Sequence, residues 1–406
     1  MRVLLLSDIP PCRNFTAGIV LDQLCSFLPE GSLACFAVID RTLDPEIPAS
    51  LSWMPIEYHE KPRENWRVLP RRLGSLTSLI GETYTSLVHV REIAHRAIKF
   101  GRHFGPDRLW CVLQGQTMIR LALPVSRGLG VPLFTELWDP PTWWLRAKEV
   151  DRMAAGRVLR EFERAVRASA SCATASWAMA EQYKCHFGTQ TIPFLPSLDL
   201  HLAMAPAKEP HPGTEFIIGM AGQLYATDEW DALTTALDSV NWKIRGRDVR
   251  IRLMGRWANF QARGKLRIEF LGWRSQEETI RLLSEADVLY CPYWFDPAFE
   301  TEARLSFPSK LTTYMAAGRP ILFHGPSYAS PARFLEDHNA GVCCYSLEPT
   351  DICMRLDQLA SDTDLYAEVT RNGRTAFEKY FTLSALRRSF LEFLQLNGGE
   401  EVTADV

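Results

Sequence analysis

Phe307-Pro-Ser-Lys-Leu-Thr-Thr-Tyr-Met-Ala-Ala-Gly-Arg-Pro-Ile321 is the stretch of sequence that decides the fold. Pro308 is typical of a helix start, and Gly318 is typical of a helix end. Pro320 then opens an apolar run that has the length of a strand. The stretch therefore predicts a helix over 309–317 that leads directly into a buried strand, which is half of a β-α-β unit.

The same alternation of apolar runs and helical patterns extends outward in both directions. Strands are predicted at 2–7, 33–39, 109–113, 132–136, 172–176, 216–221, 249–254, 266–271, 288–292, 320–324 and 341–345. Helices are predicted at 17–28, 83–100, 117–127, 151–168, 229–240, 277–285, 309–317 and 331–337. Apolar strands without internal alternation, separated by helices, are typical of parallel sheets that are covered on both faces.

A break in this alternation divides the chain into two domains. Residues 204–213 contain three prolines and predict a linker. We expect an N-terminal domain over 1–203, a C-terminal domain over 214–380, and a region 381–406 that holds a helix packing back on the N-terminal domain and a frayed tail. The predicted fold class is α/β, with two Rossmann-like, doubly wound parallel-sheet domains that face each other across a cleft. Ligands of such sheets bind at the carboxyl ends of the strands.

The composition excludes several classes of protein. The 406 residues include 45 Lys and Arg and 48 Asp and Glu, so no chain-wide basic field points to nucleic acid as a partner. The 10 cysteines form neither a disulfide framework nor a zinc-type pair, and we expect most of them to be buried thiols. Asp8 interrupts the first apolar run too early for a secretory segment or a membrane span. These features predict a cytoplasmic protein.

Lys310 is the first candidate for binding chemistry. The start of a helix presents free N–H groups and a positive dipole, so a lysine on the first turn can join them in holding a diphosphate. The residues alone leave a second interpretation open, in which 307–321 is a plain structural unit with a solvated lysine.

The stretch 307–321 resembles the signature of the donor-binding half of GT-B fold glycosyltransferases, especially bacterial enzymes of glycosyltransferase family 4. Further matches occur in the same order along the chain, at Met1–Ser7, the loop bearing Gly18, Phe216–Gly222, Phe270–Trp273, Ala286–Pro292 and Asn339–Val342. The resemblance implies a retaining enzyme that moves a sugar from a nucleotide-diphosphate sugar to a hydroxyl acceptor. The second domain would bind the donor, and the first would bind a carbohydrate or lipid-linked acceptor in surface polysaccharide or glycolipid synthesis.

The same resemblance implies no cofactor and no bound metal, because the helix dipole and cationic side chains stabilise the leaving diphosphate. The motif Asp362-Thr363-Asp364 is interpreted as a helix start rather than as a metal site. Lys310 and Glu302 are the candidate catalytic residues on the donor side. The candidate donor-binding residues are Gly18, Gly222, Gln223, Arg256, Gly272, Trp273, Glu300, Arg304, Pro308, Ser309 and Thr313.

The chain departs from the family pattern at two places. Family members carry two glutamates eight residues apart, whereas this chain has Leu305 and Thr313 there. Glu300 and Glu302 are expected to reach the donor instead, or to form an ordinary surface salt-bridge cluster with Arg304. The usual arginine and lysine after the first strand of the donor domain are also missing. Two alternatives therefore stay open, namely an inactive sugar-nucleotide-binding or regulatory subunit and a GT-B sugar-nucleotide epimerase.

The candidate acceptor residues follow strands of the first domain. Asp139 is predicted to orient or deprotonate an acceptor hydroxyl, and Trp138 and Trp143 offer flat faces to a sugar. Glu136 and Gln114 complete the predicted acceptor-binding set. The alternative is a packed loop with aromatic plugs.

Residues 61–73 carry five basic residues and one acidic residue, interleaved with apolar ones. Such a stretch can sit on anionic headgroups, at about 1 kcal/mol per basic residue. It predicts either a peripheral membrane contact at the inner face of the membrane or a solvated basic loop.

Overall fold

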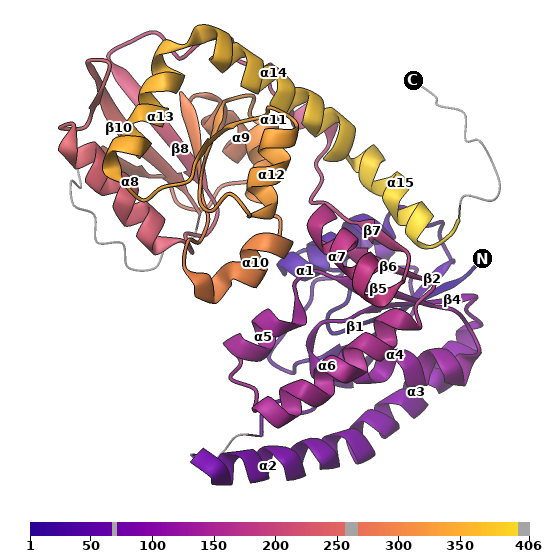
Figure 1. The fold of residues 1–406 in the computed structure, drawn as a ribbon. Coiled ribbons are helices and arrows are strands. Elements are labelled where there is room, and N and C mark those ends of the chain that lie inside the picture. The colour runs from indigo at the N-terminus through magenta and orange to yellow at the C-terminus, as the bar shows by residue number, and fades with distance from the viewer. Residues whose placement is uncertain (67–70, 256–266, 397–406) are drawn as a thin grey trace. The chain divides into compact units, whose positions relative to one another are not determined.

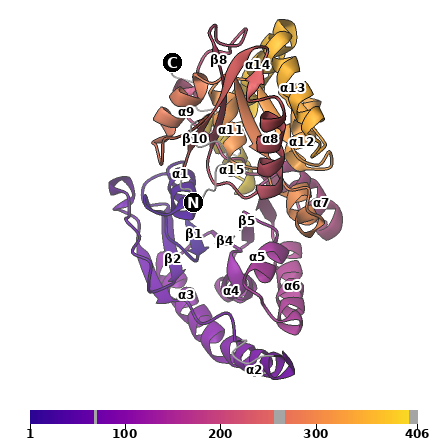
Figure 2. The same cartoon turned by 90° about the vertical axis from the view of Figure 1, so that its left-hand side faces the viewer.

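A computed structural model describes residues 1–66, 71–255 and 267–396, without the side chains of 71–76 (Figure 1). The chain forms two compact units, Met1–Phe194 with Arg387–Val406, and Leu195–Leu386. Each unit contains a sheet with helices on both of its faces (Figures 1 and 2). The predicted pair of doubly wound parallel-sheet domains is therefore confirmed.

The sheet of the first unit has the strand order β3-β2-β1-β4-β5-β6-β7, and all neighbouring strands are parallel. The strands are β1 (Val3–Ser7), β2 (Leu33–Ile39), β3 (Ile56–Glu60), β4 (Arg108–Val112), β5 (Leu133–Leu137), β6 (Ser171–Thr174) and β7 (Thr191–Pro193). Strands β1 and β2 are buried throughout, as expected for continuous apolar runs. The chain order reverses between β1 and β4, where ligands of Rossmann-like sheets bind.

The helices of this unit are α1 (Thr16–Cys25), α2 (Arg71–Tyr84), α3 (Val90–Phe104), α4 (Gly115–Leu129), α5 (Pro141–Ala147), α6 (Arg152–Arg167) and α7 (Trp177–Phe187). A π-helical turn, η2 (Thr85–His89), joins α2 to α3, so the predicted helix over 83–100 is part of a longer rod. Helix α15 (Leu383–Phe393) enters the first unit at Arg387. Its Phe390 contacts Trp110 of β4 with the ring centroids 5.0 Å apart.

The sheet of the second unit has the order β11-β10-β8-β12-β13-β14, and its strands are parallel except for β9, which pairs antiparallel with β10. The strands are β8 (Glu215–Ala221), β9 (Lys243–Ile244), β10 (Arg247–Met254), β11 (Ile268–Phe270), β12 (Val288–Pro292), β13 (Ile321–His324) and β14 (Val342–Cys344). Chain order reverses between β8 and β12. The loops at the carboxyl ends of these two strands are therefore where a ligand is expected.

The helices of the second unit are α8 (Thr227–Ser239), α9 (Gln276–Ser284), α10 (Glu300–Leu305), α11 (Lys310–Ala316), α12 (Ser330–Asp337), α13 (Pro349–Ser361) and α14 (Thr363–Tyr380). Helix α8 packs beside α13, and α11 packs beside both α9 and α14 (Figure 1). The buried cluster under α8 and α13 is centred on Phe216, Ile218 and Leu233. Asp362 caps α14 by accepting a hydrogen bond from the Leu365 N–H at 2.9 Å, which confirms the predicted helix start.

Within the described ranges, no helix combines the length and the apolar character that spanning a bilayer requires. All 10 cysteines are free thiols, and most of them are buried.

Candidate functional site

Three loops meet at the carboxyl edge of the second sheet. The Gly222 N–H, after β8, donates to the Met254 carbonyl at 3.0 Å, and the Gly255 N–H, after β10, donates to the Gly272 carbonyl at 2.9 Å. Gly255 has φ +134°, and a Cβ at this position would lie 2.8 Å from the Gly222 oxygen. Only glycine allows this approach. The structure thus places Gly222 and Gly272, two predicted donor residues, on loops joined through Gly255.

Lys310 reaches this edge from the start of α11. Its Nζ donates to the Gln223 carbonyl at 3.2 Å and lies 4.5 Å from the centroid of the Tyr225 ring. The lysine is only 8% exposed, and no carboxylate pairs with it in the part of the chain that the structure describes. Burial lowers the pKa of its ammonium to about 8. The site therefore holds a buried cation that still needs a negative partner.

Tyr314 fixes the position of α11 against the sheet. Its hydroxyl oxygen accepts from the Ala221 N–H at 3.0 Å, and the hydroxyl donates to the Tyr290 carbonyl at 3.1 Å. The tyrosine is fully buried. Because Ala221 is the last residue of β8, this contact sets the spacing between Lys310 and the loop that follows β8. Tyr314 is a positioning residue that sequence analysis did not single out, although it lies inside the quoted motif.

The turn before α11 offers fewer backbone donors than a long helix does. Ser309 is exposed and Pro308 is half-buried, but the Leu311 N–H already donates to the Pro308 carbonyl at 3.0 Å. The Leu311 amide is therefore not available to an anion. Helix α11 has seven residues, so its dipole is weaker than that of a longer helix. We therefore expect the charge of Lys310 to contribute more to anion binding than the dipole at the start of α11.

The acceptor candidates lie on the first unit, Gln114 after β4 and the others at or after the carboxyl end of β5. Glu136 is buried, and its two carboxylate oxygens accept from the indole N–H groups of Trp110 and Trp138, each at 2.8 Å. Burial raises the pKa of Glu136 to about 7, although the two hydrogen bonds lower it. The carboxyl group therefore holds Trp138 in place.

The stretch after Trp138 forms a helix, whereas one of the two predictions for it was a packed loop. Helix α5 begins at Pro141, a residue suited to the first helical position, and it carries the half-buried Trp143. Asp139 is half-buried and directly precedes this helix. Asp139 and Trp143 therefore come from a strand-to-helix junction, which holds side chains more firmly than an irregular loop.

The start of α4 carries an internal ion network instead of an open acceptor surface. Gln114 occupies its N-cap position, and the Thr117 N–H donates to the Glu64 carboxylate at 2.8 Å. Lys61 lies 3.2 Å from Asp8 and 3.8 Å from Glu64. Lys61 is therefore paired inside the first unit, and the membrane contact of 61–73 stays a prediction. Residues 67–70 of that stretch lie outside the described residues.

Residues 215–362 match the family model described as "Glycosyl transferases group 1". The matched range lies within the second unit and agrees with the resemblance to glycosyltransferases there. No curated protein sequence is a significant match to the chain.

Solved structures resemble the chain over both units. HepE from Anabaena, solved in complex with UDP, has a TM-score of 0.64 and 16% identity, with 97% of this chain and 100% of that chain covered. Sucrose-phosphate synthase from Thermosynechococcus elongatus has a TM-score of 0.67 and 12% identity, with 97% and 98% covered. A trehalose-phosphate synthase from Burkholderia vietnamiensis has a TM-score of 0.64 and 11% identity, with 97% and 100% covered. At these identities the similarity shows the fold, which is GT-B.

Thr313, a predicted donor residue on α11, is half-buried, and its hydroxyl oxygen accepts from the Gln276 amide of α9 at 3.0 Å. Trp273, on the loop after β11, is 69% exposed. Thr313 is therefore linked to α9, the helix that follows the loop of Trp273.

The glutamates upstream of Lys310 have different environments. Glu300 and Arg304 are exposed on α10 and pair at 2.8 Å, which fits the surface salt-bridge alternative. Arg304 also lies 4.3 Å from the centroid of the Tyr328 ring. Glu302 is buried on the other side of the same short helix. Arg256 lies outside the described residues.

A buried hydrogen-bond network, which sequence analysis did not predict, lies in the second unit near the carboxyl edge of its sheet. The Phe295 N–H donates at 2.6 Å to Glu229, a buried residue on the first turn of α8. His324, at the end of β13, lies 2.8 Å from the Ser346 carbonyl through Nε2 and 2.6 Å from the Tyr290 hydroxyl through Nδ1. The carbonyl can only accept, so Nε2 carries the proton and Nδ1 accepts. Burial lowers the pKa of His324 to about 4, and the ring is neutral at physiological pH.

Gly18 on α1 has a packing role that is visible in the first unit. A Cβ there would lie 2.0 Å from the Cys12 sulfur, so a larger residue would displace the loop after β1. The Cys12 N–H also donates to the Gly18 carbonyl at 3.1 Å. Close packing, rather than a left-handed backbone, accounts for glycine here. Its contact with a ligand stays a prediction.

Proposed function

We propose that this chain transfers a sugar from a nucleotide-diphosphate sugar to a hydroxyl acceptor, with retention at the anomeric carbon and without a bound metal. The group 1 match over 215–362 supports donor binding by the second unit. HepE was solved with UDP and with UDP-glucose, so a uridine diphosphate sugar is the first donor to test. The proposed acceptor is carbohydrate or lipid-linked, as in surface polysaccharide or glycolipid synthesis, and the proposed location is the cytoplasm.

The observation that carries this proposal is the environment of Lys310. Its ammonium is buried, touches only a neutral carbonyl and a ring face among the described contacts, and lies beside the exposed Gly222-Gln223 loop. A diphosphate at this loop would give the cation the negative partner that it lacks. Lys310 would stabilise the charge that develops on the leaving nucleoside diphosphate, which is the role of a preorganised cation.

On the donor side, Gly222 and Gly272 would let the backbone approach the nucleotide, and Trp273 would offer an exposed ring to the base. Ser309 and Lys310 would offer their backbone amides to the phosphates. On the acceptor side, Asp139 would orient or deprotonate the attacking hydroxyl, and Trp138, fixed by Glu136, would face the sugar.

The experiment measures release of nucleoside diphosphate from a panel of nucleotide sugars, with and without simple glycosides as acceptors and in the presence of a chelator. We expect at least one uridine diphosphate sugar to be turned over, and we expect Lys310→Ala to lower the rate by about 100-fold or more. Lys379→Ala is the matched control, because Lys379 is exposed and lies 4.8 Å from the Tyr380 ring centroid in the same unit. A rate that Lys379→Ala lowers as much as Lys310→Ala would contradict the proposed role.

A second candidate function is a nucleotide-sugar-binding subunit without transferase activity. It is favoured by Leu305 and Thr313, which cannot act as the two glutamates of the family. Binding of a nucleotide sugar with no turnover under any acceptor condition would support this candidate. Conversion of UDP-GlcNAc to an epimer in the absence of acceptor would identify the third alternative, an epimerase.

A further inference from the structure

The first unit contains a hollow of about 440 Å³ between η2, α4 and α6. Four arginines line it, and Glu161 is the one carboxylate among the residues that form its wall. Gly115 begins α4 at the carboxyl end of β4, whereas Arg127 lies in the last turn of the same helix. At 1.5 Å per residue, Arg127 is about 18 Å along the helix from that edge. The hollow is therefore separate from the candidate acceptor residues.

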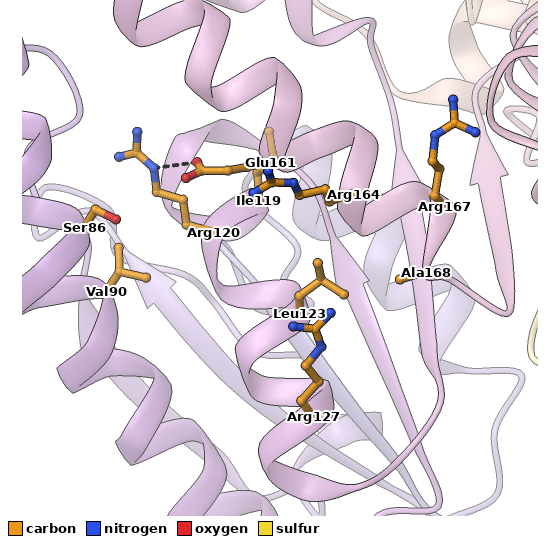
Figure 3. A pocket seen from close by; sticks show the side chains of 10 residues that line it. All are labelled: Ser86, Val90, Ile119, Arg120, Leu123, Arg127, Glu161, Arg164, Arg167 and Ala168. Carbon is orange, nitrogen blue, oxygen red and sulfur yellow. Dashed lines mark hydrogen bonds and ion pairs between the residues drawn. The ribbon is translucent and has the colours of Figure 1, made fainter.

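The four arginines differ in their ion-pair and hydrogen-bond partners. Arg120 is buried and pairs with Glu82 at 3.1 Å and with Glu161 at 3.0 Å. Arg167 pairs with Glu163 at 2.9 Å, donates to two backbone carbonyls, and points away from the centre of the group in Figure 3. These two side chains are part of the framework of the unit.

Arg127 and Arg164 are the remaining two. Both are exposed, and within residues 1–66, 71–255 and 267–396 neither has a carboxylate partner. In Figure 3 the Arg127 guanidinium lies beside Leu123, whereas the Arg164 side chain extends toward Ile119 and Glu161. Both residues line the same hollow, and each guanidinium group offers several N–H donors to an oxyanion.

The rod formed by α2 and η2 also carries exposed apolar side chains, namely Ile80, Tyr84, Leu87 and Val88. Their spacing puts them on one side of the rod, and Ser86, which lines the hollow, lies on another side. Exposed apolar groups in this number mark an interaction surface rather than ordinary solvent-exposed helix.

We propose that the hollow between η2, α4 and α6 binds a phosphate group through Arg127 and Arg164. The phosphate belongs either to a soluble phosphate compound or to a phospholipid headgroup. Planar guanidinium groups bind phosphate oxygens in a bidentate manner, which favours phosphate over a carboxylate of similar charge.

The experiment compares the full chain with the double variant Arg127→Gln/Arg164→Gln. The matched control is Arg387→Gln/Arg388→Gln, which also removes two exposed arginines of the first unit but does not touch the hollow. The first arm titrates inorganic phosphate by calorimetry at low ionic strength. The second arm measures flotation with vesicles of phosphatidylglycerol and phosphatidylcholine, and with vesicles of phosphatidylcholine alone.

We expect at least a tenfold loss of phosphate or anionic-vesicle binding in the Arg127/Arg164 variant, and less than a twofold change in the control. Binding in the first arm without flotation assigns a soluble phosphate ligand, and flotation with anionic vesicles assigns a lipid. Because both arginines are exposed, the variant should melt within a few degrees of the wild type, which circular dichroism checks. Equal losses in the two double variants, or no binding in either arm, would overturn the proposal.

Discussion

The ammonium of Lys310 lies 3.2 Å from the carbonyl oxygen of Gln223, a residue 87 positions away along the chain. This contact joins the start of α11 to the loop after β8, and it occurs where the order of the strands reverses. The carbonyl stabilises the charge only in part, because it is a neutral acceptor. A phosphate oxygen in the same position would be a stronger partner, so the contact marks where a diphosphate is expected to bind.

Nucleotide binding should depend on pH through Lys310. Burial lowers the pKa of its ammonium to about 8, so the lysine is charged below this pH and loses its proton above it. Affinity for a nucleoside diphosphate should therefore be constant from pH 6.5 to 7.5 and fall between pH 8 and 9.5. In Lys310→Arg this fall should disappear, because arginine keeps its charge over the whole range. Calorimetric titrations with UDP at four pH values test this expectation.

Glu136 should make the free energy of unfolding depend on pH, and this free energy should fall as the pH rises from 4.5 through 7. Its pKa in the folded state is raised to about 7, above the ordinary value of 4.5 in the unfolded chain. The folded state then binds more protons between these two values, so this contribution to stability is fully present below pH 4.5 and is lost as the pH rises through 7. The loss is about 3 kcal/mol at most.

Urea unfolding of wild type and Glu136→Gln at pH 5 and pH 8 measures this contribution. The drop in unfolding free energy from pH 5 to pH 8 should be smaller in the variant by an amount of this order. An identical pH dependence in both proteins would show that Glu136 does not titrate in this range.

Gly255→Ala should disrupt the junction of the donor loops. The new Cβ would lie 2.8 Å from the Gly222 oxygen, and the backbone φ of +134° is unfavourable for alanine. We expect a loss of about 2–4 kcal/mol in stability, together with weaker nucleotide binding. Gly246→Ala is the control, because Gly246 also has a positive φ of +76° but no atom within 4 Å of the new Cβ. The control should lose about 1 kcal/mol and bind the nucleotide normally, as measured by thermal unfolding and calorimetry.

Tyr314→Phe should weaken the link between α11 and β8. The variant leaves the buried Ala221 N–H without its acceptor at 3.0 Å, which costs about 1–3 kcal/mol. Because α11 carries Lys310, nucleotide affinity should fall as well, while the affinity of the Lys310→Ala variant should change little when Tyr314→Phe is added. Additive losses in the double variant would mean that Tyr314 does not act through Lys310.

The sheets were predictable because most of their strands are buried runs with clear ends. Strands β8, β12 and β13 are mostly apolar segments, and Gly318 separates α11 from β13. Strand β3 was missed because its sequence, Ile56-Glu-Tyr-His-Glu60, alternates with polar residues at the edge of the sheet. Helix α5 was missed because two prolines and two tryptophans in succession suggested a loop, although proline is favourable at a first helical position.

The site was predictable only where residues are close in sequence or match a family motif. Lys310 was found through its motif. Its contact with Gln223 and the bond between Thr117 and Glu64, 53 positions apart, are set by the order of strands in each sheet, which no local pattern contains. The same holds for the His324 network. Its members come from three different strands or the loops that follow them, so each residue alone has the sequence signature of an ordinary core position.

The central claim is that Lys310 binds the diphosphate of a nucleotide donor. The most direct measurement is the dissociation constant of UDP, with a chelator present, for wild type, Lys310→Ala and Lys379→Ala. We predict that UDP binds wild type and Lys379→Ala alike and binds Lys310→Ala at least 30-fold more weakly, about 2 kcal/mol, as expected for a lost charge-assisted contact. Equal affinity in all three proteins would contradict the claim.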